Sequence, residues 1–117
     1  DDANMFYAQK KAGWRVDYKR VKELLSDLFE VSFMNYYLTI PSIRDSAYPK
    51  TKSYLENLKE RYGDILEIKS KPLKYIFDRQ TKKTQKKGNI DTMLTIDLMN
   101  SIHDQDIDVA IVMSGDS

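Results

Sequence analysis

The fold is decided by residues 31–40, which read VSFMNYYLTI. This run is rich in β-branched and aromatic residues and predicts a buried strand. A second run, VAIVM at residues 109–113, is apolar at every position, and shorter runs at 65–68 and 73–77 predict two further strands. Continuous apolar strands are typical of a parallel sheet that is covered on both sides.

Helices are predicted between these strands. Apolar spacing and composition indicate them at residues 4–12, 17–29, 50–62 and 90–102. Gly13 and Gly63 end the first and third helices, and Asp17 caps the second. We therefore expect one α/β domain over residues 1–117, a three-layer, Rossmann-like arrangement of a parallel sheet flanked by helices. Because no strand precedes Asp1 and the chain stops just after the last apolar run, we expect a domain truncated at both ends.

Composition narrows the chemistry. The 117 residues are 41% hydrophobic and 32% charged, with a formal net charge of +1, so the protein is globular and its overall charge indicates no partner. The absence of cysteine excludes disulfides, thiolate zinc sites and cysteine nucleophiles. A single histidine, His103, disfavours a Ser-His-Asp triad and a multi-histidine metal site. No apolar run is long enough for a membrane span, and we expect a cytoplasmic protein.

Three aspartates occupy positions where a parallel sheet binds ligands. Asp116 follows the last apolar run, Asp1 precedes the first helix, and Asp91 lies near the start of the fourth. Their convergence would raise their pKa values unless cations were bound, and Mg²⁺ or Mn²⁺ accepts such oxygen ligands. Two such ions can activate water against a phosphodiester. Asp97 is a weaker candidate, because on an ideal helix it points about 120° away from Asp91. Each aspartate alone is more often a cap or turn residue.

A basic stretch lies beside these acids. Residues 78–88 lack apolar periodicity and are predicted to form an exposed loop. The cations expected to contact a phosphate backbone here are Lys74, Arg79, Lys82, Lys83, Lys86 and Lys87. Tyr75 and Phe77 lie among them and are expected either to stack on unpaired bases or to be buried in the sheet.

Three segments also resemble a known family. Residues 1–7, DDANMFY, resemble the opening D-x-x-N-hydrophobic motif of NYN domains, which are PIN-like proteins that include the LabA-like members. Residues 87–91, KGNID, together with Asp97, resemble the family's K-G-x-h-D-x(5)-D segment. Residues 114–117, SGDS, resemble the start of its S-G-D-S-D-F motif. The three segments occur in the family's order and span nearly the whole chain.

The resemblance implies a PIN-like sheet with a ribonuclease site. By position, Asp1, Asp91 and Asp116 would bind magnesium or manganese, and Asn4 would orient a ligand or water. Asp97 and Ser114 are weaker site candidates, and Lys87 would contact phosphate. The family's first strand and the second aspartate of S-G-D-S-D-F are not in this sequence.

We therefore predict a metal-dependent endoribonuclease, with RNA as partner and a homo-oligomer left open. Two alternatives stay open. One is a non-catalytic RNA-binding or regulatory module of the same fold. The other is a phosphatase or phosphotransferase with an aspartyl nucleophile at Asp1 or Asp116.

Overall fold

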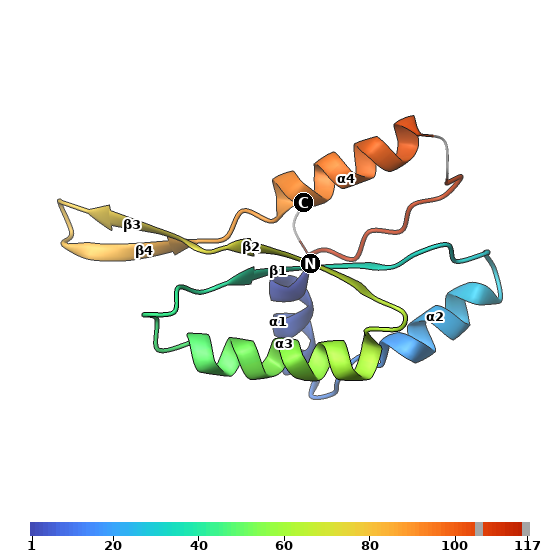
Figure 1. Cartoon of the computed structure of the whole chain (residues 1–117), viewed down its shortest axis with the longest axis horizontal. Helices are drawn as coiled ribbons and strands as arrows, with labels where there is room; N and C mark the ends of the chain where they lie inside the picture. The colour runs from blue at the N-terminus through green and yellow to red at the C-terminus, as the bar shows by residue number, and fades with distance from the viewer. Residues whose placement is uncertain (105–106, 116–117) are drawn as a thin grey trace.

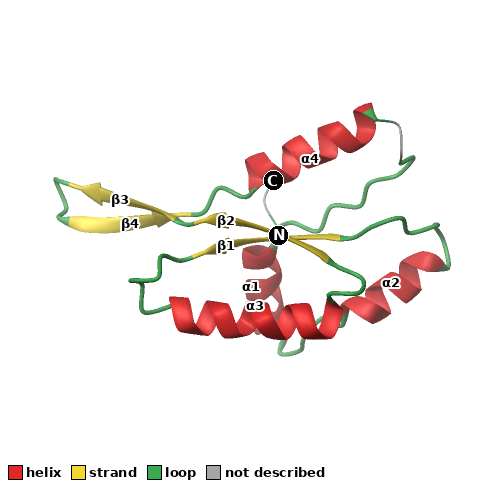
Figure 2. Ribbon diagram, viewed as in Figure 1, coloured by secondary structure: helices red, strands yellow, loops and turns green. Residues whose placement is uncertain are grey.

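The computed structural model describes residues 1–104 and 107–115. Figure 2 shows the helices and strands of this part of the chain. In order, the elements are α1 (Asp2–Ala12), α2 (Tyr18–Ser26), β1 (Asn35–Ile40), α3 (Tyr48–Tyr62), β2 (Glu67–Pro72), β3 (Lys74–Asp78), β4 (Lys83–Lys87) and α4 (Asp91–His103).

The centre of the fold is a parallel pair of strands. β1 and β2 pair in register from Asn35 opposite Glu67 to Ile40 opposite Pro72, and α3 forms the crossover between them. Figure 1 shows α1 and α3 on one side of this pair and α4 on the other. Because neighbouring side chains of a strand point to opposite faces, β1 contributes to both layers. The expected α/β class, with a parallel sheet between helices as in a PIN-like domain, is confirmed.

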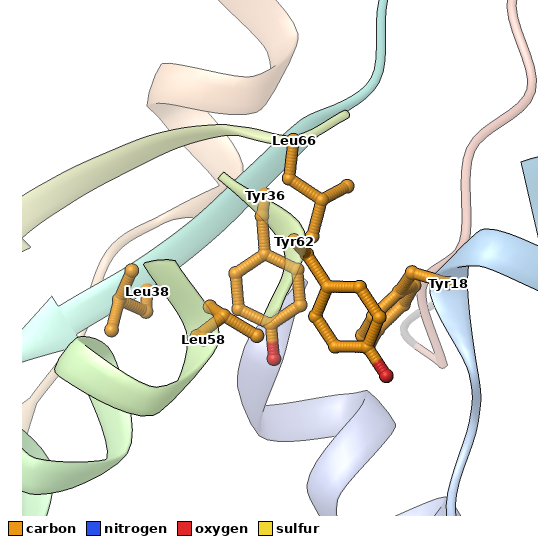
Figure 3. Packing of buried hydrophobic residues seen from close by; sticks show 6 residues of the cluster. All are labelled: Tyr18, Tyr36, Leu38, Leu58, Tyr62 and Leu66. Carbon is orange, nitrogen blue, oxygen red and sulfur yellow. The ribbon is translucent and has the colours of Figure 1, made fainter. Parts of the chain in front are cut away.

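The core lies between this strand pair and the helices on the α3 side (Figure 3). Its buried members are Tyr18, Tyr36, Leu38, Leu58, Tyr62 and Leu66. The Tyr18 ring meets Tyr36 and Tyr62 edge to face, with ring centroids 5.5 and 5.3 Å apart. Such pairs add roughly 0.5–1.5 kcal/mol beyond the area they bury. Aromatic packing thus joins α2, β1 and the end of α3.

The four predicted helices are confirmed, and local signals explain their ends. Gly13 ends α1 with a φ of 77°, in the left-handed region that glycine adopts without steric cost. Asp17 caps α2 by accepting a hydrogen bond from the backbone nitrogen of Lys19 at 3.0 Å. α2 ends at Ser26, three residues before the predicted end, and α3 begins at Tyr48, two residues before the predicted start. These differences lie at helix ends, where side-chain periodicity carries little information.

The basic stretch is not a loop, and this prediction was wrong. Residues 83–87 form β4, which pairs antiparallel with β3 from Lys74 opposite Lys87 to Asp78 opposite Lys83. All five residues of β4 are exposed. Since neither face of this strand is buried, its sequence carries no apolar alternation, and main-chain hydrogen bonds alone define it.

The predicted strand at residues 109–113 is also wrong. This segment is extended in outline but belongs to no sheet. Together with residues 29–37 it lines a cavity of about 480 Å³. A strand needs a neighbouring backbone within hydrogen-bond reach, and none of the described strands pairs with this segment. The strand at 31–40 likewise begins only at Asn35, and the run predicted at 65–68 is a strand from Glu67 onward.

Candidate active site

The start of α1 fixes one predicted acid and the asparagine after it. Asp1 is the N-cap of α1, and its carboxylate accepts a hydrogen bond from the backbone nitrogen of Ala3 at 3.1 Å. The other carboxylate oxygen accepts a hydrogen bond from Nδ2 of Asn4 at 2.7 Å. Asp1 is therefore a cap residue, as the simpler interpretation of a lone aspartate expected. The same contacts also hold its carboxylate in one orientation.

The C-terminal segment approaches this helix start from the far end of the sequence. The Asp1 amino group donates to the carbonyl oxygen of Met113 at 3.3 Å, and Nδ2 of Asn4 lies 3.4 Å from the Ser114 hydroxyl. The backbone of Gly115 comes so close that a Cβ there would lie 2.9 Å from Oδ1 of Asn4. Three predicted site residues, Asp1, Asn4 and Ser114, thus lie together. Asp116 lies outside the described residues.

Asp91 stands at the start of a second helix nearby. It is the first residue of α4, and the Ile90 position before it supplies no side-chain cap. Burial lowers the pKa of the Asp1 amino group, and the charges of Asp2 and Asp91 act in the opposite direction. Asp1 and Asp91 thus each stand at the N-terminal end of a helix, where the helix dipole favours anions.

Asp97 is engaged in a different contact. Its Oδ2 accepts hydrogen bonds from the Lys69 ammonium and from the Tyr37 hydroxyl, each at 2.8 Å. The Lys69 partner, more than Tyr37, lowers the pKa of the Asp97 carboxyl. Asp97 and Asp1 line the same cavity, but the Asp97 carboxylate is already neutralised by an ammonium group from β2.

The predicted phosphate-binding cations occur on the β3–β4 hairpin. Lys74, Arg79, Lys82, Lys83 and Lys87 are all exposed there. Lys86 differs from them, because its ammonium lies 2.9 Å from the Asp45 carboxylate in the loop after β1. Neither aromatic on β3 is buried in a sheet, since the Tyr75 and Phe77 side chains are 38% and 61% exposed. The Tyr75 hydroxyl donates to Asp45 at 2.8 Å, so Phe77 has the freer ring.

Sequence comparison assigns the family. The sequence profile of the NYN domain matches residues 1–117, the whole chain. The chain belongs to the NYN domain family. NYN domains are a PIN-like nuclease family.

A curated relative of this NYN domain is the low amplitude and bright protein LabA of Synechococcus elongatus. The two sequences are 27% identical over 117 residues, which is 99% of this chain and 59% of LabA. The chain thus spans about three fifths of the length of that relative. No solved structure matches the chain significantly. In residues 1–104 and 107–115, no helix has the length and apolar character that crossing a bilayer requires.

The candidate site residues of this NYN domain offer the type of atom that a hard cation binds. Asp1, Asp91, Asn4 and Ser114 all offer oxygen, the ligand atom that Mg²⁺ and Mn²⁺ prefer. The described residues nevertheless contain no group of three aspartate, glutamate, histidine or cysteine side chains that could hold a metal ion. A third carboxylate at this place is the predicted role of Asp116.

Several site contacts gave no sequence signal. Asp45 looked like an ordinary loop residue, yet it binds Lys86 and Tyr75. Asp2 accepts a hydrogen bond from the buried Tyr36 hydroxyl, which attaches the start of α1 to β1. Burial, and then the Asp2 charge, raise the pKa of Tyr36. Both contacts join residues more than 25 positions apart, which no local pattern indicates.

Proposed function

We propose that this NYN domain is a divalent-metal-dependent endoribonuclease that hydrolyses RNA phosphodiesters with acidic residues from the starts of α1 and α4. One observation carries the proposal. Asp1 and Asn4 of the first motif meet Ser114 and Gly115 of the last motif, and Asp91 of the middle motif begins α4. Two of the three segments that carry the family resemblance therefore meet, although they lie at opposite ends of the sequence.

Asp1, Asp91 and Asp116 are the carboxylates that would hold Mg²⁺ or Mn²⁺. When bound, such an ion supplies positive charge against the phosphodiester and a reactive water. Hydrolysis adds the water oxygen to phosphorus, breaks one bond from phosphorus to a ribose oxygen, and leaves a proton on the released ribose hydroxyl.

The chain's own groups orient the reactants. Asn4 and the Ala3 backbone nitrogen each donate to one oxygen of the Asp1 carboxylate. The carboxylate is therefore already oriented before a metal ion binds to it. The backbone nitrogens at the starts of α1 and α4 favour an anionic phosphate nearby. Lys87 is the last residue of β4, four residues before Asp91. It would contact the phosphate backbone of RNA bound at the acidic site.

Manganese titration of the intact protein with a labelled mixed-sequence RNA tests this proposal. We expect cleavage that requires the metal and falls at least 100-fold in Asp91→Asn. The matched control is Asp104→Asn, because Asp104 caps the opposite end of α4 and should leave cleavage unchanged. Full cleavage by Asp1→Asn, Asp91→Asn and Asp116→Asn variants would refute the assignment.

A second candidate is a non-catalytic RNA-binding module of the same fold. It is favoured by the exposed lysines of the hairpin and by the lack of a three-residue metal group among the described residues. It predicts salt-sensitive RNA binding without turnover at any manganese concentration. The titration decides between the two candidates, since both bind RNA and one of them cuts it.

A further inference from the structure

The two faces of the β3–β4 hairpin differ in their partners. Residues directly opposite each other in an antiparallel pair point to the same face. Lys74 with Lys87 and Asp78 with Lys83 therefore lie on one face, and Tyr75 with Lys86 lies on the other. We call the first the outward face and the second the anchored face.

The anchored face is attached to the loop after β1. Asp45 there accepts from the Tyr75 hydroxyl at 2.8 Å and from the Lys86 ammonium at 2.9 Å. The backbone nitrogen of Ser42 donates to the same Tyr75 hydroxyl at 2.8 Å. The Asp45 side chain is only 5% exposed, whereas that of its partner Lys86 is 51% exposed. They hold the hairpin in a defined direction from the body of the domain.

The outward face carries cations without acidic partners. Among the described residues the ion pairs are Lys69 with Asp97 and Lys86 with Asp45, and neither uses a lysine of this face. Asp78 is the nearby acid, but its carboxylate accepts from the backbone nitrogens of Gln80 and Thr81 in the turn. Lys74, Lys83 and Lys87 thus present their charge to solvent along a strand pair about 17 Å long.

The base of the hairpin adjoins the acidic site. Only residues 88–90 separate Lys87 from the first residue of α4, and Ile90 among them is buried. Figure 1 shows the hairpin extending away from the strand pair, with its β4 end linked by a short loop to the start of α4. The lysine that ends β4 is thus close in sequence to Asp91.

We propose that the outward face of the β3–β4 hairpin is an arm that binds the phosphate backbone of single-stranded RNA leading away from the acidic site. Lys74, Lys83 and Lys87 make the contacts, with Arg79 and Lys82 extending them at the turn. Duplex recognition needs a surface that spans about 16 base pairs, far more than this arm offers. This inference rests on RNA being the ligand of the proposed function, but it concerns binding and not cleavage.

Fluorescence anisotropy with a labelled 20-nucleotide single-stranded RNA, without divalent metal, tests the arm. We expect the combined Lys74→Gln, Lys83→Gln and Lys87→Gln variant to bind at least tenfold more weakly. Its slope of log Kd against log salt should fall by about 2, since each single-strand phosphate contact contributes about 0.7. The matched control replaces Lys50, Lys52 and Lys59, three exposed lysines of α3, and should bind within twofold of the unchanged protein.

Several results would overturn the arm. Unchanged affinity in the hairpin variant, or equal loss in the α3 control, would remove the hairpin as the binding surface. Tighter binding of a duplex, or of anionic phospholipid vesicles, would replace single-stranded RNA as its ligand. Lys83→Glu is a second variant should the triple change perturb folding, and it should weaken RNA binding as well. Asp91→Asn separates the two proposals, because it should abolish cleavage and leave arm binding intact.

Discussion

The Lys86 ammonium lies 2.9 Å from the Asp45 carboxylate, and this pair joins the β3–β4 hairpin to the loop after β1. The contact changes the role of one predicted RNA-binding residue. Lys86 lies between Gln85 and Lys87, and the sequence does not distinguish the three. The Lys86 charge, however, forms an ion pair with Asp45 of the same domain. The same carboxylate also receives the Tyr75 hydroxyl. Direction of the hairpin and charge of its outward face are thus set by different residues.

Acid should release the hairpin before the domain unfolds. The hydrogen bond from Lys86, with those from Ala47 and Tyr75, lowers the pKa of Asp45 from 3.8 to about 2. A carboxyl with a depressed folded-state pKa stabilises fully above its unfolded value and loses that contribution as the pH falls toward its folded value. The protection factors of the β3 and β4 amides, which compare measured with intrinsic exchange at each pH, should therefore fall between about pH 4 and pH 2.

The control for the acid release is Asp45→Asn. This variant should show fast exchange in the hairpin already at neutral pH and no further step in that window. Equal protection of β3 and β4 in both proteins at pH 6 would contradict the anchor.

Lys82 should be a site of removable strain. Its φ of 52° lies in the left-handed region, in the turn between β3 and β4. For residues with a Cβ this conformation costs about 1 kcal/mol, and glycine avoids that cost. Lys82→Gly should therefore raise the melting temperature by a few degrees. Lys82→Ala keeps the Cβ and removes the same charge, so it should leave the melting temperature unchanged. A gain in both variants would assign the effect to charge.

The elements that the sequence predicted well are determined by residues close to one another in the chain. Gly13, Asp17 and Gly63 marked helix ends because backbone geometry and capping act within a few residues. The three family motifs were also local patterns, but the contact of the last motif with Asn4 did not come from sheet pairing, because residues 109–113 belong to no sheet. The side-chain contacts that orient Asp1 required the distance from Asn4, which spacing alone does not give.

The failures concern pairing between distant segments. β4 has no apolar alternation to predict it, because its partner β3 contributes only backbone hydrogen bonds. The run at 109–113 has strong strand composition, but none of the described strands pairs with it. Strand composition reports burial and side-chain shape, whereas a strand exists only where a second backbone lies alongside. The role of Asp45 could not be predicted for the same reason, because its partner Lys86 is distant in the sequence.

The Lys69–Asp97 pair should contribute modestly to stability. Its two side chains are 29% and 25% exposed, and the carboxylate also accepts from Tyr37. Asp97→Asn keeps the size of the side chain and removes the charge, so it should cost about 1 kcal/mol and lower the melting temperature by about 5 °C. Because the Lys69 contact lowers the pKa of Asp97, this difference should persist at neutral pH and vanish in acid below the pKa of the folded protein.

A paired variant checks that the Asp97 effect comes from this contact. Lys69→Gln should destabilise by a similar amount, and the double variant should cost less than the sum of the two. Strict additivity would show that Asp97 and Lys69 act separately.

Gly115 should control the acidic site through Asn4. A Cβ at position 115 would lie 2.9 Å from Oδ1 and 3.2 Å from Cγ of Asn4, so Gly115→Ala must displace that amide by a few tenths of an ångström. The amide is the donor that holds the Asp1 carboxylate at 2.7 Å. Groups that orient a metal ligand are typically worth 10- to 100-fold in metal affinity or activity. We therefore expect about a tenfold loss of manganese-dependent cleavage with an almost unchanged melting temperature.

A double-variant cycle decides whether that loss passes through Asn4. Asn4→Ala alone should cost about 10- to 100-fold in cleavage, because the Asp1 carboxylate keeps its backbone contact to Ala3 but loses its amide donor. Once the amide is gone, the methyl group at position 115 has nothing left to displace. Adding Gly115→Ala to Asn4→Ala should then cost little more, and the two effects should fail to multiply. Independent losses would mean that Gly115 acts on its own turn, and that the contact between the first and last motifs does not orient Asp1.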